Sequence, residues 1–375
     1  MLLTVLPAKY RRLWSFIATD GVIPVIEAAT PRRMTRILRD AQLLESGHVT
    51  AVSIVQVGGQ LRSAARLALK FSQPVPAHVP QRVYLKLVTP GLIRGRGHDR
   101  ALREWEFYTS VTTALTPSLL SMGVVRCLDA AAEADGAAHL VLQDVSETHT
   151  QPEWPIPPTQ AEVERAVDWA AGFHRTWWEQ PRLHDLRRPK TSPEGLAAVA
   201  ERHLTAISQQ LSSVERCRTR RVYDVIAGLW ERGTLGAPPR RAYTLTHGDL
   251  HFWNLLYPQA STDSIAVIDW EDWKVGHAMT EMAYLIGLHW DRSRDAAEEV
   301  ALIKRYHSVL TATGSVLYSW DDCWRDYRFG MIAMFTVPAV FWDRQLMASV
   351  WWPHLKRIHA AYAQLECDEL LADLR

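Results

Sequence analysis

The sequence predicts an α+β fold in which a β-rich N-terminal part precedes a mainly helical remainder. Short runs rich in β-branched and aromatic residues gather between residues 49 and 145, and long amphipathic segments follow from about residue 159. Of the 375 residues, 47% are hydrophobic and 22% are charged, a globular composition on a chain long enough for two domains. We expect an N-terminal lobe over 1–142, a linker over 143–150 and a helical lobe over 151–375.

The N-terminal elements follow from local patterns. Apolar residues recur at helical spacing over 31–44, and the proline at position 31 suits the first turn of a helix. The runs 49–57, 65–71, 82–88 and 139–145 are typical of strands, and a helix is expected over about 99–115. A glycine pair at 58–59 and a proline-rich stretch before residue 82 separate the first three strands. The expected order is therefore helix, three strands, helix, strand.

The remainder is predicted to be helical over 159–178, 193–232, 296–312 and most of 320–375. One strand-like pair, LLYP (255–258) and SIAVIDW (264–270), interrupts it. This pair follows directly on the segment HGDLHFWN (247–254).

Charge and cysteine content exclude several classes of protein. The net charge of +1 gives no signature of a nucleic-acid-binding protein. Four scattered cysteines without a CxxC motif argue against a disulfide scaffold or a structural zinc site. The longest uncharged apolar run, 329–342, is shorter than the ~20 residues of a membrane span. We expect a cytoplasmic protein that binds neither nucleic acid nor membrane and is a monomer or homodimer.

The segment HGDLHFWN (247–254) is the most informative part of the chain. Asp249 and Asn254 stand five residues apart just before an apolar strand, and Asp269 ends the next strand. This is the spacing of the catalytic loop and metal-binding aspartate of kinase-type phosphoryl-transfer enzymes. A carboxylate can accept the proton of an attacking hydroxyl, and amide and carboxylate oxygens suit Mg²⁺.

The N-terminal strands supply the partners that such an enzyme needs. Lys86 lies on the third strand and Glu104 in the following helix, the order in which a lysine holds the α- and β-phosphates and a glutamate holds the lysine. Glu106 is an alternative to Glu104, and helical geometry allows only one of them to face Lys86.

Two further segments are candidates for nucleotide contacts. Gly58, Gly59 and Gln60 lie between the first two strands, where backbone amides can approach phosphates; an ordinary hairpin turn is an equally good interpretation. The stretch Gln143, Asp144 and Val145 ends the fourth strand, where a linker would present backbone groups to adenine.

These residues together resemble the aminoglycoside phosphotransferase and choline kinase superfamily, the small-molecule branch of the protein-kinase-like fold. HGDLHFWN matches the H-G-D-x-H-x-x-N motif of that superfamily, and IDWE (268–271) is similar to its metal-binding segment. The resemblance extends over about 45–290, with a looser likeness of YSWDDCWRDYRFG (318–330) to the ecdysteroid-kinase-like branch.

The resemblance implies a two-lobed fold, ATP, Mg²⁺ and phosphorylation of a hydroxyl on a small molecule. It implies Asp249 as catalytic base, with His247 and His251 beside it, and Asn254 and Asp269 as metal ligands. Two positions depart from the usual pattern: Glu281 stands where an aspartate often stabilises the catalytic loop, and Gln143 stands where an acid is common. Neither departure removes a reacting group.

The acceptor is expected to be an amino alcohol, a sugar, an aminoglycoside or another natural product. Carboxylates and tryptophans near the motif would suit an amine-bearing molecule through charge and cation–π contacts. In the competing interpretation, the carboxylates lie on a solvated helix face and the tryptophans pack in the core. The candidate acceptor-binding residues are Glu271, Asp272, Trp273, Trp290, Asp291 and Asp295.

Two other functions remain open from the sequence. The first is a nucleotide-binding pseudokinase that keeps the fold without turnover. The second is a metallohydrolase in which His247, Asp249 and His251, alternating along a strand, bind a metal on one face.

Overall fold

The structure is a computed structural model, and it describes residues 20–58, 63–88, 102–111, 120–154, 156–186, 193–231, 242–260, 264–290 and 295–373. The chain forms two compact units. The first comprises 1–150 and 258–272, and the second comprises 151–257 and 273–375. The segment 258–272 is grouped with the first unit, whereas the sequence analysis placed it in the helical lobe over 151–375.

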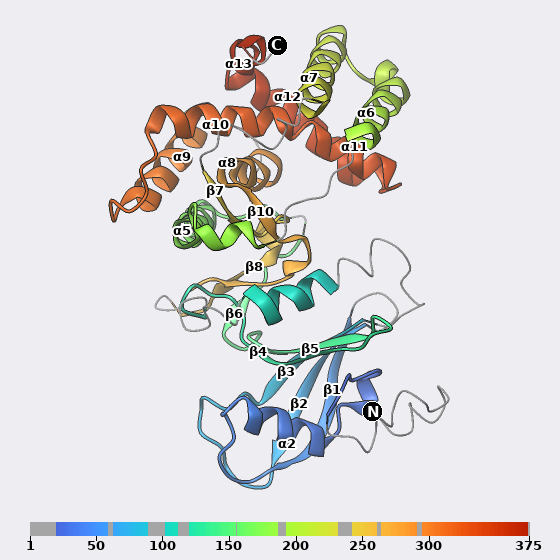
Figure 1. Cartoon of the computed structure of the whole chain (residues 1–375), viewed down its shortest axis with the longest axis vertical. Coiled ribbons are helices and arrows are strands. Elements are labelled where there is room, and N and C mark those ends of the chain that lie inside the picture. Colours follow the sequence, from blue (N-terminus) through green and yellow to red (C-terminus); the bar gives the residue numbers. More distant parts are fainter. Residues whose placement is uncertain are drawn as a thin grey trace. The chain divides into compact units, whose positions relative to one another are not determined.

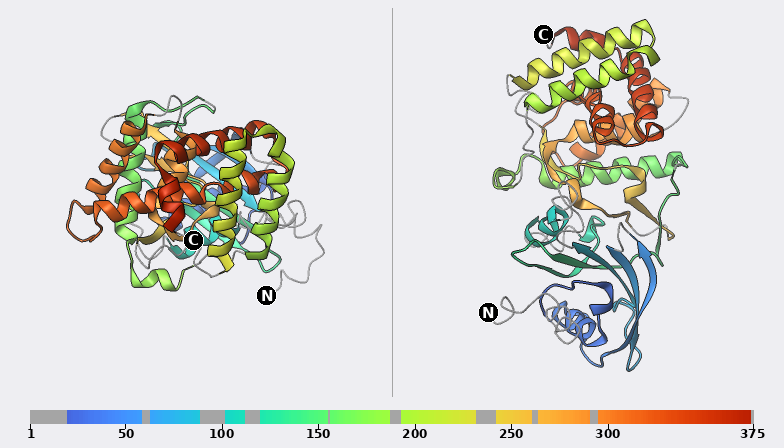
Figure 2. Two further views of the ribbon diagram at one scale, coloured as in Figure 1. Left: turned by 90° about the horizontal axis from the view of Figure 1, so that it is seen from above. Right: turned by 90° about the vertical axis from the view of Figure 1, so that its right-hand side faces the viewer.

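The first unit is built on a five-stranded antiparallel sheet (Figures 1 and 2). Its strand order is β1-β2-β3-β5-β4. The strands are β1 (Val49–Gly58), β2 (Ala64–Phe71), β3 (Arg82–Val88), β4 (Cys127–Ala132) and β5 (Ala138–Gln143). The four strands expected from β-branched patterns are present. No strand was predicted at β4, because its alanine-rich run has a low β propensity.

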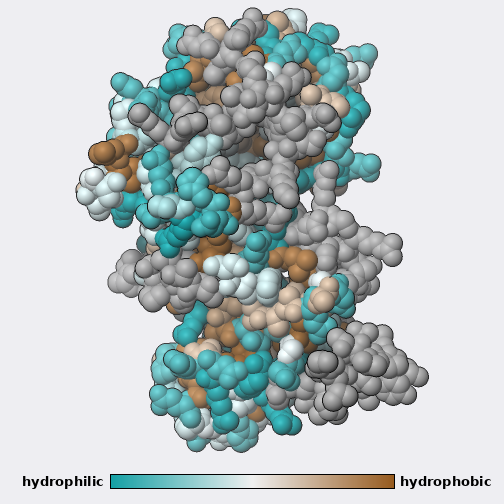
Figure 3. Space-filling view, in the orientation of Figure 1, coloured by the Kyte–Doolittle hydropathy of each residue, from teal (hydrophilic) through white to brown (hydrophobic). Residues whose placement is uncertain are grey.

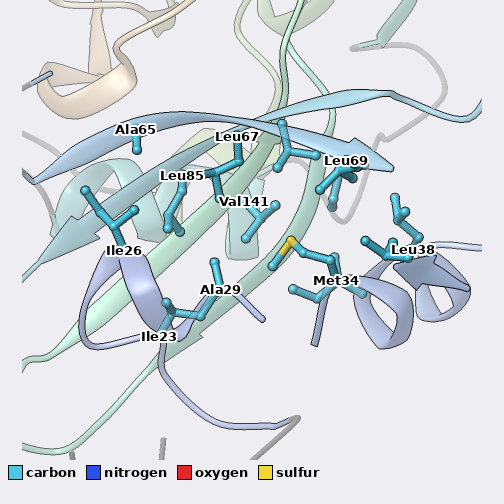
Figure 4. Packing of buried hydrophobic residues seen from close by; sticks show 14 of the residues in the cluster. Ile23, Ile26, Ala29, Met34, Leu38, Ala65, Leu67, Leu69, Leu85 and Val141 are labelled. Carbon is cyan, nitrogen blue, oxygen red and sulfur yellow. The ribbon is translucent and has the colours of Figure 1, made fainter. Parts of the chain in front are cut away.

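A helical layer covers one face of this sheet. The 3₁₀ turn η2 (Ile26–Ala28) and the helix α2 (Pro31–Asp40) pack their apolar side chains on it. Figure 4 shows Met34 and Leu38 of α2 facing the inward side chains of β2, β3 and β5. Thr30 caps α2 by accepting a hydrogen bond from the backbone of Arg33, and Pro31 begins the helix as predicted.

The rest of the first unit comprises a helical segment, two short strands and a 3₁₀ turn. Residues 102–106 are α-helical and continue into the π-helical turn η4 (Phe107–Val111). The segment 258–272 contains β9 (Ala266–Val267) and η8 (Trp270–Asp272), and β6 (His149–Thr150) ends the N-terminal part of the unit. Val267 forms a parallel bridge with Val124, and the buried Trp270 ring stacks on Phe107 at 4.1 Å. These contacts explain why the segment belongs to this unit.

The second unit is mainly helical (Figure 1). A two-stranded antiparallel ribbon pairs β7 with β10 in the part of the chain described. The helical elements of this unit are α5 (Gln160–Trp177), η5 (Pro181–His184), α6 (Pro193–Ile207), η6 (Ser208–Gln210), α7 (Ser213–Glu231), η7 (Phe252–Asn254), α8 (Ala278–Met282), η9 (Ala283–Leu288), α9 (Ala296–Thr311), α10 (Trp320–Ala333), α11 (Thr336–Asp343), α12 (Ala348–Gln364) and α13 (Cys367–Asp373). The strands are β7 (Tyr243–Thr246), β8 (Leu255–Pro258) and β10 (Lys274–His277).

Several helices of the second unit pack against one another. The helix α5 packs against α9, and α10 packs against α8, while α6 contacts both α7 and α11. A capping box begins α5: Thr159 accepts from the Glu162 backbone, and the Glu162 carboxylate accepts from the Thr159 backbone at 2.7 Å. The single helix expected over 193–232 is divided at η6.

One drawn face of the molecule is mostly hydrophilic, and the cysteines form no disulfide. In the face drawn in Figure 3, hydrophilic residues predominate among the coloured atoms of both units. The four cysteines are free. Within the described ranges, no helix has both the length and the hydropathy needed to cross a membrane.

Candidate active site

Lys86 is the centre of a charged cluster in the first unit. Its ammonium donates to both carboxylate oxygens of Glu104, at 2.8 and 2.7 Å, and to the Oδ1 of Asp269 at 2.8 Å. Glu104 is buried, so its negative charge is stabilised by the ammonium group of Lys86. The two carboxylates outweigh the effect of desolvation and hold the pKa of Lys86 well above its usual value. Of the two glutamates weighed from the sequence, Glu104 is the one that contacts Lys86.

Three elements bring this cluster together. Lys86 lies in β3, between β2 and β5, where it pairs with Ala64 and Leu140. The helical segment that carries Glu104 is tied to the residues after Asp269 by Arg103. The Arg103 guanidinium donates to the carbonyl of Glu271 at 2.9 Å and to the Asp272 carboxylate at 3.2 Å.

Asp269 has a strained backbone. Its φ of +70° lies in the left-handed region, which a residue with a branched polar side chain occupies at a cost of about 1 kcal/mol or more. The stacking of Trp270 on Phe107 and the hydrogen bond from the Trp270 indole to the Val267 carbonyl hold the next residue in place. The fold therefore fixes the Asp269 carboxylate toward Lys86 despite the strain.

A second cluster lies in the loop that follows β7 in the second unit. Gly248 has a φ of +82°, a conformation that glycine adopts without a Cβ penalty. Its N–H donates to Glu281 Oε1 at 2.7 Å, and the other oxygen of Glu281 lies 2.9 Å from His174 Nε2. Burial alone would raise the pKa of Glu281, but the hydrogen bond and charge of His174 outweigh it and lower that pKa. Glu281 therefore supports the loop despite its longer side chain.

Asp249 is held by contacts on both its side chain and its backbone. The Tyr284 hydroxyl donates to Asp249 Oδ1 at 2.6 Å, and His251 Nε2 lies 3.9 Å from Oδ2. The buried Asn254 amide donates to the backbone carbonyl of Asp249 at 3.0 Å. The Asp249 side chain keeps 22% of its surface exposed, so the carboxylate is oriented and still open to a reactant.

The two histidines of the motif stabilise the loop. His247 is fully buried, and its Nδ1 accepts from the Asp249 backbone at 3.3 Å. The His251 ring packs 5.7 Å from that of Trp253. Within the ranges that the structure describes, no three His, Cys, Asp or Glu side chains are grouped to hold a metal ion. The metallohydrolase interpretation gains no support from this arrangement.

The other nucleotide candidates lie at strand ends of the first unit. Gly58 ends β1 opposite Ala64, and Gly59 and Gln60 lie outside the described residues. The backbone of Gln143 donates to Arg126, and Asp144 accepts from Ser146 in a tight turn. The carbonyl of Val145 accepts from the N–H groups of Thr148 and His149. These contacts give the stretch after β5 a defined backbone, and its contact with adenine stays a prediction.

Most of the predicted acceptor residues have other structural roles. Trp273 and Trp290 are buried in the second unit, and Asp295 caps α9 by accepting from the Ala297 backbone. Glu271 and Asp272 belong to the first unit, where Arg103 holds them, and Asp291 lies outside the described residues. These positions lend no support to an acidic acceptor pocket.

Sequence reasoning missed three supporting residues, Tyr284, His174 and Arg103. Tyr284 follows Glu281 by three residues, a spacing that places two side chains on one helix face, so the pair could have been found. His174 lies about seventy residues before the motif, and only the tertiary fold brings it to Glu281.

Comparison with known proteins decides the family. The model of the phosphotransferase enzyme family known as APH matches residues 62–318, more than two thirds of the chain. The chain belongs to the phosphotransferase enzyme family. This confirms the resemblance to small-molecule kinases and makes the protein a phosphotransferase of that type. A search of curated proteins found no match.

Solved structures agree with this phosphotransferase in fold. A microcompartment-associated aminopropanol kinase is 13% identical, with a TM-score of 0.53, over 91% of this chain and 98% of its own. The ethanolamine kinase of Plasmodium vivax is 10% identical, with a TM-score of 0.52, over 96% of both chains. At such low identity these likenesses confirm the two-lobed α+β kinase-like fold.

Proposed function

We propose that this phosphotransferase moves the γ-phosphate of ATP to a hydroxyl of a small molecule, with Asp249 as the base. The contact of Lys86 with both Glu104 and Asp269 is the observation that supports this most directly. A lysine held between two carboxylates is positioned, charged and able to exchange one of them for a phosphate oxygen.

The donor set suits Mg²⁺. Asn254 and Asp269 supply an amide oxygen and a carboxylate, both hard oxygen ligands of the kind that Mg²⁺ prefers. The Asn254 amide nitrogen donates to the Asp249 carbonyl, which fixes the rotation of the amide group and the direction of its oxygen. When bound, Mg²⁺ would neutralise negative charge on the β- and γ-phosphates.

Each of the proposed site residues then has its own role. Lys86 leaves Asp269 and binds the α- and β-phosphates, while Glu104 keeps the ammonium in place. The acceptor hydroxyl donates to Asp249 and attacks the γ-phosphorus. Its O–H bond breaks as the proton passes to Asp249, an O–P bond forms, and the bond from the γ-phosphorus to the bridging oxygen breaks to release ADP.

The loop contacts keep Asp249 in position for this step. Glu281 anchors the Gly248 N–H, and Tyr284 fixes the rotation of the Asp249 carboxylate. Positioning of this kind lowers the entropy cost of the reaction, because the carboxylate is already oriented when the acceptor binds.

The substitution Asp249→Asn tests the assignment of the base. It removes the proton acceptor but leaves Lys86, Asn254 and Asp269 unchanged, so the Kd for Mg-ATP should change little. We expect the rate of phosphate transfer to fall about 10²- to 10⁴-fold. The measurement is ADP release with a panel of alcohols, together with ATP titration. Transfer at the wild-type rate would show that another group is the base.

A further inference from the structure

The buried His289 ring packs against both side chains that lie next to the Asp249 carboxylate. Tyr284 donates to Asp249 Oδ1 at 2.6 Å, and His251 Nε2 lies 3.9 Å from Oδ2. The centre of the His289 ring lies 4.7 Å from that of Tyr284 and 5.4 Å from that of His251. One buried imidazole is therefore in contact with the neighbours of both oxygens of the proposed base.

The same imidazole binds the backbone of the turn that carries Tyr284. Its Nδ1 lies 2.8 Å from the carbonyl oxygen of Tyr284, and because a carbonyl only accepts, Nδ1 carries a proton. Burial lowers the pKa of His289 well below its usual value, so the ring is neutral and has no proton on Nε2. His289 is therefore held in one tautomer, with its N–H directed at Tyr284.

This hydrogen bond lies at the end of the π-helical turn η9. In a π-helix the N–H of residue i+5 donates to the carbonyl of residue i, which would pair His289 with Tyr284. In η9 the N–H of His289 donates to the carbonyl of Ile286, and the side chain of His289 donates to that of Tyr284. The imidazole thus takes the place of a backbone donor at the residue whose hydroxyl binds Asp249.

Two side chains of α12 hold His289 and the end of η9. The centre of the His354 ring lies 5.0 Å from that of His289, and its Nδ1 lies 3.3 Å from the Leu288 carbonyl oxygen. The Arg357 guanidinium donates to the same carbonyl at 2.8 Å. The position of His289 is therefore fixed by α12 and η9 together.

We propose that His289 is a positioning residue for phosphate transfer, and that its imidazole holds the Tyr284 hydroxyl against the Asp249 carboxylate. This rests on the function proposed above and adds to that site a residue that acts through Tyr284 rather than on a reactant. The effect of His289 on the transfer therefore passes through one hydroxyl, which separates it from a general effect on the fold.

His289→Leu and His289→Asn form a matched pair of variants. Their side chains have nearly the same shape, but only Asn carries an N–H on Cγ, where Nδ1 of the imidazole is attached. We expect kcat to fall about tenfold in His289→Leu and to stay within about threefold of the wild type in His289→Asn. Equal kcat values in the two variants would overturn the proposal.

The measurement is ADP release from Mg-ATP by the full chain. The acceptors are ethanolamine, glucose and kanamycin, and the one phosphorylated fastest is used. Where none of them reacts, hydrolysis of Mg-ATP, with water in the place of the alcohol, gives the rate. KM for ATP should stay within about twofold in both variants, because the hydrogen bond that is removed joins His289 to Tyr284 rather than to Lys86 or Asp269.

A double-mutant cycle with Tyr284→Phe tests whether His289 acts through the Tyr284 hydroxyl. In the Tyr284→Phe background, His289→Leu should change kcat less than about twofold, because the hydroxyl that His289 positions is already absent. Additive effects of the two substitutions would overturn the proposal and give His289 a general structural role.

His307→Leu is the control for loss of a buried imidazole contact. The His307 Nε2 also donates to a backbone carbonyl, that of Tyr318 at 2.7 Å, outside the proposed site. This variant should lower the melting temperature and leave kcat per folded molecule unchanged. A fall in kcat as large as that of His289→Leu would contradict the assignment.

The same assay separates this proposal from the function on which it rests. An active wild type with an equally active His289→Leu would overturn the role of His289 and leave the kinase function in place. Folded wild-type protein that releases no ADP from Mg-ATP would overturn the kinase function, and with it the role of His289 in the transfer.

Discussion

Tyr284 is the residue whose role is most specific to this structure. Its hydroxyl donates to Asp249 Oδ1, and the carbonyl of Tyr284 lies 2.8 Å from the Nδ1 of His289. The π-helical turn η9 places both groups. π-Helical turns widen the helix by one residue, and they occur often at functional sites. We interpret Tyr284 as a residue that positions the base.

The substitution Tyr284→Phe removes this hydrogen bond and keeps the ring. A hydrogen bond to a charged group contributes about 1.5–3 kcal/mol, so kcat should fall about tenfold or more. KM for ATP should stay within about twofold, because the hydrogen bond that is removed joins Tyr284 to Asp249 rather than to Lys86 or Asp269. Steady-state kinetics at saturating ATP separate the two constants.

A structural role alone would give a different pattern. In that case the melting temperature of Tyr284→Phe would fall while kcat per folded molecule stayed at the wild-type value. Tyr318→Phe is a matched control, because its hydroxyl also binds a carboxylate, that of Asp326 at 2.7 Å, outside the proposed site.

At the level of single residues, the motif indicated candidate site residues but not the contacts that support them. Asp249, Asn254 and Asp269 were identified as candidates because one loop and two short strands fix their spacing along the chain. His174 and Arg103 were not found, because their contacts join segments more than one hundred residues apart. The order of elements predicted that Lys86 pairs with a glutamate of the following helix, but the choice of Glu104 over Glu106 came from the structure.

At the level of elements, short polar segments between strands and helices position much of the candidate site. Gly248 and Asp269 both have positive φ values, and each lies two residues after the end of a strand, β7 or β9. Helix caps such as Asp295 stabilise the frame behind them. The capping role of Asp295 competes with the role in acceptor binding that the sequence suggested.

The substitution Asp295→Ala distinguishes these two roles. Loss of the N-cap hydrogen bond to Ala297 should lower the free energy of unfolding by about 1 kcal/mol. KM for an amine-bearing acceptor should not change. Chemical denaturation checks the first expectation and steady-state kinetics the second, with Glu298→Gln, an exposed first-turn acid, as the control. A rise in KM without loss of stability would restore Asp295 to the acceptor site.

Element boundaries were predicted well where a cap or a β-branched run marks them. The proline at 31 marked the start of α2, and the predicted helix over 159–178 agrees with α5, which the structure shows to begin at a capping box. The breaks at η6 and the π-helical turn η9 have no comparable signal, because they depend on the packing of α6, α7 and α8 against other helices. The ribbon of β7 and β10 was missed, since each strand has only four residues.

At the level of the whole molecule, buried histidines make stability depend on pH. Burial lowers the pKa of His203, His354 and His359 to about 4, whereas the unfolded chain has a histidine pKa near 6.5. Between these values the unfolded state binds more protons than the folded state. Stability is therefore complete above about pH 6.5 and is lost as the pH falls toward 4.

The expected loss is large. A difference of about 2.5 pKa units corresponds to roughly 3 kcal/mol for each histidine at the acidic limit. We expect the melting temperature to fall steeply between pH 6.5 and pH 4. In His359→Gln the melting temperature should fall less steeply over this pH range than in the wild type. This comparison does not depend on the melting temperature of the variant at neutral pH. Differential scanning calorimetry across this range is the measurement, and a melting temperature constant down to pH 4.5 would contradict this account.

The fold class was predictable because its evidence is spread over the entire chain. Strand-like runs gather before residue 150 and helical periodicity follows, and both are present in the structure. The assignment of 258–272 to the first unit was not predictable. It depends on the packing of Trp270 on Phe107 and on the bridge from Val267 to Val124. No local sequence pattern indicates either contact.

The central claim is that this phosphotransferase binds Mg-ATP through Lys86 and Asp269. The measurement that tests it most directly is the shift in melting temperature caused by ATP, with and without Mg²⁺, in wild type and in Asp269→Asn. ATP at 100 times its Kd should stabilise the wild type by about 2.7 kcal/mol in the presence of Mg²⁺. Asp269→Asn should lose most of this shift. Folded wild-type protein that ATP does not stabilise, or a variant stabilised as strongly as the wild type, would contradict the account.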